Sequence, residues 1–146
     1  MQPEIHMSWP AMFLAVVASF AIGSVWYGKL FGKAWAREAG FPADWKPKVL
    51  DMIRGSVLNL VGTFVMVFVM AHFVQVWRPS TWNAGEDMPN IVYGLIAALF
   101  AWVGFAVPVL LNPVGYEGKS WRYFMIGAGY QLVSLLTIGT ILSLWN

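Results

Sequence analysis

Four long uncharged runs divide the chain: residues 5–28, 55–77, 88–116 and 123–146, with His6 and His72 taken as neutral. They lack the period-2 alternation of β-barrel strands, and about 20 apolar residues cross a hydrocarbon core of about 30 Å as a helix. Helices are also expected because lipid leaves the backbone no outside partner. The pattern predicts one domain, residues 1–146, with transmembrane helices near Trp9–Tyr27, Val49–Trp77, Asn90–Leu111 and Arg122–Trp145.

Composition supports this all-α, polytopic membrane fold class. Of the 146 residues, 59% are hydrophobic and only 11% are charged, and there is no cysteine. A soluble domain of ordinary composition carries about 25% charged residues. The composition therefore excludes a soluble globular domain, a disordered chain and a disulfide scaffold, and it leaves no thiol for redox chemistry.

The basic residues predict an orientation. The segment 29–54 holds six Lys and Arg residues and the segment 119–122 holds two, whereas the loop around Arg78 holds one. Basic loops are retained in the cytoplasm. We therefore expect both termini to lie outside the cytoplasm and the first and third loops to lie inside it.

The first of these loops carries a short periodic segment. Lys29, Lys33 and Arg37 recur every four residues, with apolar side chains between them, until Gly40 and Pro42. This spacing predicts a short amphipathic helix in the headgroup plane, with a basic stripe that faces anionic lipid. Such a helix could be a topology anchor or a surface that binds lipid or a partner, and the sequence leaves both open.

Small residues form two stripes on the predicted helices. The first stripe is Ala11, Ala15, Ser19 and Gly23, and the second is Gly94, Ala97, Ala101 and Gly104. Such stripes let helix backbones approach closely in lipid, either inside one bundle or between two subunits. Pro108 follows the second stripe and predicts a kink, because it leaves the carbonyl of Gly104 without its helical partner.

No Asp, Glu, Lys or Arg falls at mid-membrane depth, which disfavours a classical ion-coupled transporter. The neutral polar residues on the predicted helices include Asn59, Thr63, Gln131 and Ser134. They indicate either hydrogen bonds between helices or a pathway for a small polar or neutral solute. Trp102, also at mid-depth, is expected to serve packing.

Catalytic and ligand-binding patterns are missing from the sequence. His6 and His72 would share one leaflet, but their spacing is not that of a metal motif. No nucleophile–base ordering, nucleotide loop or pair of catalytic carboxylates can be identified. We expect no enzyme activity, no metal, no cofactor and no nucleic-acid partner.

Several segments together carry a family resemblance: residues 25–35 (VWYGKLFGKAW), 70–73 (MAHF), 102–105 (WVGF) with Pro108, and 129–139 (GYQLVSLLTIG). The chain resembles a family of small bacterial four-helix membrane proteins of unknown function, whose signature is Trp-Tyr-Gly-x-Leu-Phe-Gly-x-x-Trp. It departs from the family at Gln131, where members often carry histidine. The resemblance implies the fold and a bacterial inner (plasma) membrane, and it implies no activity.

These observations favour a non-enzymatic integral membrane protein that acts through helix–helix association. Besides the bilayer, its partner would be a second copy in a homo-oligomer or a larger membrane complex of which it is an accessory subunit. The alternative is a small oligomeric channel or facilitator for a small polar or neutral solute.

Overall fold

The computed structural model describes residues 5–145, and all regular structure in that range is helical. Helix α1 spans Trp9–Val25 and continues into a π-helical turn, η1 (Trp26–Leu30). The elements that follow are α2 (Gly32–Ala39), α3 (Val49–Val76), the 3₁₀ turn η2 (Pro79–Trp82), α4 (Asn90–Ala101), the π-helical turn η3 (Trp102–Ala106), α5 (Val107–Tyr116) and α6 (Trp121–Leu144).

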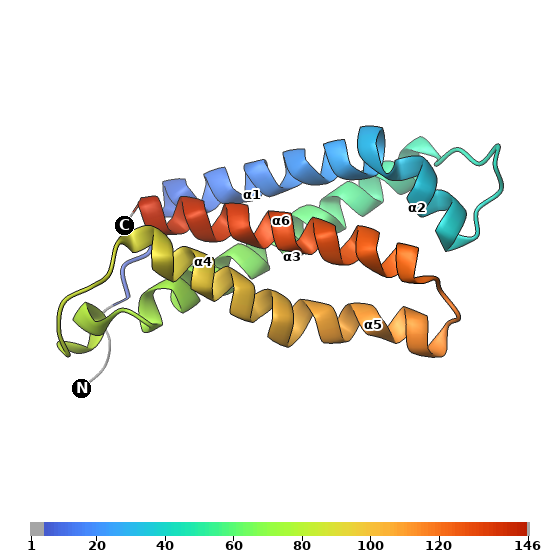
Figure 1. Ribbon diagram of the computed structural model, residues 1–146. Helices are drawn as coiled ribbons and strands as arrows, with labels where there is room; N and C mark the ends of the chain where they lie inside the picture. Colours follow the sequence, from blue (N-terminus) through green and yellow to red (C-terminus); the bar gives the residue numbers. More distant parts are fainter. Residues whose placement is uncertain (1–4, 146) are drawn as a thin grey trace.

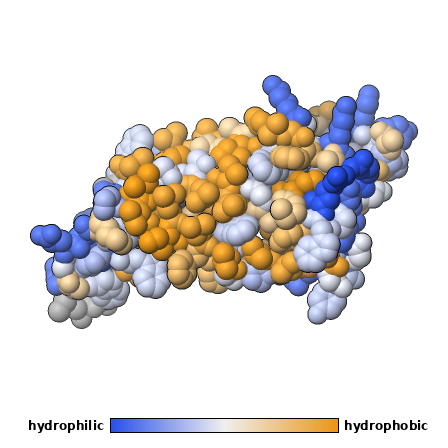
Figure 2. Space-filling view, viewed as in Figure 1, coloured by the Kyte–Doolittle hydropathy of each residue, from blue (hydrophilic) through white to orange (hydrophobic). Residues whose placement is uncertain are grey.

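Four helical stretches are long and apolar enough to cross a membrane: Trp9–Leu30, Val49–Val76, Asn90–Tyr116 and Trp121–Leu144. Apolar side chains cover the middle of the molecule and hydrophilic ones gather at its two ends (Figure 2). The prediction of four helices that are long and apolar enough to span a membrane is confirmed, and these helices suggest a multi-pass membrane protein.

The four stretches run up and down, so alternate connections meet at the same end (Figure 1). Helix α2, the loop that follows it and the loop between α5 and α6 lie at one end. Eight of the nine Lys and Arg residues lie in these segments or in the adjoining parts of η1, α3 and α6, and we call this the basic end. Arg78 lies at the opposite end, with the start of α1 and the loop between α3 and α4.

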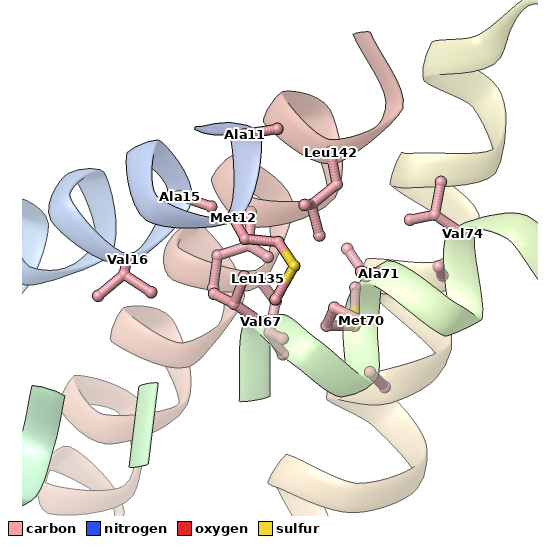
Figure 3. Packing of buried hydrophobic residues seen from close by; sticks show 14 of the residues in the cluster. Ala11, Met12, Ala15, Val16, Val67, Met70, Ala71, Val74, Leu135 and Leu142 are labelled. Carbon is pink, nitrogen blue, oxygen red and sulfur yellow. The ribbon is translucent and has the colours of Figure 1, made fainter. Parts of the chain in front are cut away.

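Helix α6 is the centre of the bundle. Buried residues make up 44% of its most apolar window, against 22–28% for the other three stretches, and it packs against α1, α3, α4 and α5. The core is built from α1, α3, α4 and α6, and Met12, Val67 and Leu135 converge in it (Figure 3). Since lipid removes the hydrophobic drive between helices, close packing of this kind holds the bundle together.

The third stretch differs from its prediction. It continues to Tyr116 instead of ending at Leu111, and the turn before Pro108 widens into η3, where the Val107 N–H donates to the Trp102 carbonyl five residues back. Pro113 lies inside α5. The helix runs through it because a proline removes one hydrogen bond, whereas ending a helix within lipid leaves four carbonyls without partners.

Candidate functional site

The first half of α3 stands apart from the bundle. From Val49 to Gly62 every residue except Ser56 is exposed, and the buried positions of α3 begin at Thr63. The second half packs normally, with Val67, Met70 and others in the core. One side of the bundle is therefore open near the basic end.

This opening is a groove with a volume of about 1440 Å³. One side comes from α1, η1 and α2, the other from α3, and the loop between α2 and α3 lies at the basic end. The lining of α3 runs from Asp51 to Asn59. Asn59 lies ten residues into α3, or about 15 Å along it at 1.5 Å per residue. The last charged residue of this stretch is Arg54, five residues or about 8 Å before Asn59, so the groove reaches partway into one leaflet of about 15 Å.

Aromatic rings form a continuous wall of the groove. The Tyr27 ring meets the Tyr130 and Trp35 rings edge-on, with centroids 5.2 and 5.9 Å away. Phe41 follows at 5.7 Å from Trp35 and stacks on Trp45 at 4.1 Å. Such contacts hold rings in place, and the wall runs from buried Tyr130 of α6 out to the loop.

Charged side chains of both signs line the end of the groove nearest the loop. They are Lys33, Arg37 and Lys46 on the positive side, and Asp44 and Asp51 on the negative side. All five are exposed. Arg37 lies 3.7 Å from Glu38, and the other four form no ion pair with any residue in the range 5–145.

The Trp-Tyr-Gly segment builds the corner between α1 and α2. The Trp26 indole N–H donates to the Ile126 carbonyl of α6 at 3.0 Å, which fixes η1 to the bundle. The Phe31 N–H donates to the Trp26 carbonyl at 2.7 Å and closes the wide turn. At Gly32 a Cβ would overlap the Tyr27 carbonyl oxygen, so only glycine allows α2 to fold back here.

Helix α2 is clamped to the start of α6. The Ser120 hydroxyl donates to Glu38 at 2.5 Å, and the Lys119 ammonium donates to the Ala39 carbonyl at 2.9 Å. The Arg122 guanidinium lies 3.9 Å from Glu38. The role of Glu38 in this clamp was not predicted from the sequence. The available signal was that Glu38 is the one acidic residue in the basic segment 29–40.

The predicted basic stripe divides in the structure. Lys33 and Arg37 lie on α2 and line the groove, whereas Lys29 belongs to η1 and lies outside it. The three residues therefore do not share one helix, because the chain turns at Phe31, whose backbone is not helical. The position of α2 in the headgroup plane and its contact with lipid stay predictions.

Both small-residue stripes face the interior of this chain. Ala11, Ala15 and Ser19 are buried, and a Cβ at Gly23 would come within 3.1 Å of the Tyr130 hydroxyl. In the second stripe Gly94, Ala97 and Ala101 are buried. Gly104 is the exception, because it is exposed and a Cβ there would meet nothing within 4 Å.

The four neutral polar candidates have different surroundings. Ser134 is buried, and its hydroxyl is hydrogen-bonded to that of Ser19. Thr63 is buried, Gln131 is half-buried and Asn59 lines the groove. Among the described residues, the structure brings only Asn59 into the groove.

Trp102 is half-buried, and its indole N–H donates to the Ala128 carbonyl of α6 at 2.8 Å. Both histidines have hydrogen-bond partners within the chain. The backbone of His6 exchanges two hydrogen bonds with the Gln75 side chain, and the His72 Nδ1 lies 2.8 Å from the Phe68 carbonyl. Within residues 5–145 no three His, Cys, Asp or Glu side chains are grouped to hold a metal.

Arg78 was not singled out from the sequence as a site residue. Its guanidinium carbon lies 5.7 Å from the centre of the Tyr93 ring. Its Nε and Nη2 atoms are buried and have no hydrogen-bond partner among residues 5–145. The ring attracts the charge, but it leaves these two donors unsatisfied.

Comparison with known proteins yields a family and no activity. The family model described as "Protein of unknown function (DUF1761)" matches residues 10–143. No curated protein and no solved structure matches the chain. Because the matched region covers nearly all of the chain, the protein belongs to the DUF1761 family of proteins of unknown function.

Proposed function

We propose that this chain is a non-enzymatic membrane protein that binds a lipid-like amphiphile in the groove beside α3. The observation that carries the proposal is the depth of the groove. It begins at the charged loop and ends near Asn59, about 15 Å along α3, so it extends from the charged end into one leaflet and does not cross the hydrocarbon core.

The dimensions favour a lipid over the other occupants. A transmembrane helix of a partner would need a groove that crosses the whole hydrocarbon core, about 30 Å. Sites for small molecules usually measure about 300–1,000 Å³, less than the 1440 Å³ of this groove. The aromatic wall supplies an apolar surface for a hydrocarbon chain.

The small-residue stripes were the main sequence evidence for association with a second protein. They pack within the chain instead, so they no longer favour that function. The surroundings of the polar residues give the channel hypothesis no added support. Ser134 is paired with Ser19, and fully buried Met12, Val67 and Ile138 fill the core of the described chain.

Native mass spectrometry of the full chain, purified in mild detergent, tests the binding function. We expect a monomer that retains one lipid molecule after the bulk lipid is removed. A stable dimer or a stoichiometric partner protein, without bound lipid, would contradict lipid binding and support association. Protein that retains no lipid and binds none on addition would also refute the proposal.

For the location, we propose a bacterial inner membrane with the basic end in the cytoplasm and both termini outside. The support is the eight-to-one distribution of Lys and Arg between the two ends. A tag after Asn146 should be accessible to a protease added to intact spheroplasts. A tag that is cleaved only after lysis would reverse this orientation.

A further inference from the structure

We propose that the groove selects a zwitterionic headgroup in which a phosphate stands beside a primary ammonium, as in phosphatidylethanolamine. This inference rests on the proposed lipid-binding function and adds the identity of the headgroup. Its basis is that the loop end of the groove presents unpaired charges of both signs.

The positive side of the groove suits the phosphate. Lys33 and Arg37 stand one helical turn apart on α2, and Lys46 belongs to the loop that leads into α3. The two lysines have no carboxylate partner among the described residues. Ammonium and guanidinium groups form charge-assisted hydrogen bonds to phosphate oxygens, so these side chains provide the donors that a phosphodiester needs.

The negative side distinguishes this site from a simple basic patch. Asp44 in the loop and Asp51 in the first turn of α3 also line the groove, and neither forms an ion pair within residues 5–145. Carboxylates repel a purely anionic headgroup and accept hydrogen bonds from an ammonium. Electrostatic complementarity of this kind contributes chiefly to specificity, and here it favours a headgroup that carries both charges.

The depth of the groove indicates where the headgroup and the acyl chain of the lipid would lie. With the headgroup among the charged residues at the loop, an acyl chain would extend along the aromatic wall toward Ser24 and Asn59. A trimethylammonium group carries the same charge as a primary ammonium but donates no hydrogen bond to a carboxylate. The arrangement therefore ranks phosphatidylethanolamine above both phosphatidylglycerol and phosphatidylcholine.

A competition experiment tests the ranking. The purified, delipidated full chain is mixed with equal amounts of dioleoyl phosphatidylethanolamine, phosphatidylglycerol and phosphatidylcholine, and native mass spectrometry measures the bound fraction of each. We expect about fivefold more phosphatidylethanolamine than either competitor, which is the scale of one or two exposed ion pairs. Equal binding of all three lipids overturns the headgroup inference and leaves lipid binding intact, whereas binding of none refutes both.

Paired variants test the acidic and the basic side chains of the groove separately. D44N/D51N should remove the preference over phosphatidylglycerol, and K33Q/K46Q should weaken binding of both lipids alike. K48Q/R54Q is the matched control, since these residues lie at the same end but do not line the groove; it should leave the ranking unchanged. All six residues are exposed, so the variants should unfold at the same temperature as the parent chain. A preference that survives D44N/D51N, or that K48Q/R54Q removes, contradicts the assignment.

Discussion

Two glycines set how closely α4 and α6 approach. A Cβ at Gly94 would overlap the carbonyl oxygen of Gly139, and a Cβ at Gly139 would overlap that of Gly94. Both are buried, and fully buried Ala98 lies beside this contact. The backbones themselves touch here, so no neighbouring side chain can turn aside to make room.

We predict that Gly94→Ala destabilises the fold by at least about 3 kcal/mol, because the two helices must move apart. Gly104→Ala is the control from the same predicted stripe. Its Cβ points into open space, and the change should stay within about 0.5 kcal/mol. Thermal unfolding in detergent, followed by circular dichroism, measures both. If the two variants unfold alike, the close crossing of α4 and α6 is wrong.

Arg78 leads to a prediction of the opposite sign. Arg78 is half-buried, its buried Nε and Nη2 lack acceptors among the described residues, and burying polar atoms without hydrogen-bond partners costs free energy. Arg78→Met should raise the free energy of unfolding by about 1 kcal/mol, net of the lost contact with the Tyr93 ring. Chemical denaturation in detergent gives this value.

Arg122→Met provides the comparison for Arg78. Arg122 is 63% exposed and lies 3.9 Å from Glu38, so its replacement should change the stability by less than about 0.5 kcal/mol. A clear loss of stability in Arg78→Met, with Arg122→Met unchanged, would mean that the Arg78 guanidinium has a stabilising partner.

At the scale of elements, two tryptophans fasten two wide turns to α6. Trp26 opens η1 and Trp102 opens η3, and their indole N–H groups donate to the carbonyls of Ile126 and Ala128. Gly129 lies beside the Trp26 ring, where a Cβ would come within 3.1 Å of it. The turns and the surface of α6 therefore fit together as one unit.

Trp26→Phe and Trp102→Phe should each lower the free energy of unfolding by about 1 kcal/mol, because each removes a hydrogen bond while keeping a ring. Trp9→Phe is the control: Trp9 is 51% exposed at the start of α1. Equilibrium unfolding of the three variants makes the comparison. Equal stabilities for all three would mean that the indole hydrogen bonds do not hold the turns.

The sequence predicted the elements well where local properties decide them. The lengths of the uncharged runs determine the four membrane-spanning stretches, and Pro108 marks an interruption of the third helix. The form of that interruption was not predictable, because the wide turn at Trp102 also involves a carbonyl on α6, 26 residues later. The same holds for Lys29, which the four-residue spacing placed on one helix with Lys33 and which lies in η1.

At the scale of the whole molecule, the groove depends on where α3 leaves the bundle. No residue pattern specifies that angle. From the sequence, Asn59 was therefore expected to form hydrogen bonds between helices or to line a solute pathway, and its place in the wall of this groove was not predicted. One hint was present: α3 has 28 residues, although about 20 suffice to cross the hydrocarbon core. The first half of α3, whose residues 49–62 stand apart from the bundle, contains this excess length.

Filling the groove with a bulky side chain tests whether it holds a lipid. Gly55 lines the groove, whereas Gly62 lies on the same helix outside it, and a Cβ at either position meets nothing within 4 Å. Both variants, Gly55→Trp and Gly62→Trp, are purified in parallel, and native mass spectrometry counts the lipid molecules that each retains. Gly55→Trp should lose the bound lipid, because the indole would occupy the groove, while Gly62→Trp should keep it. Equal lipid retention by the two variants would contradict lipid binding in the groove.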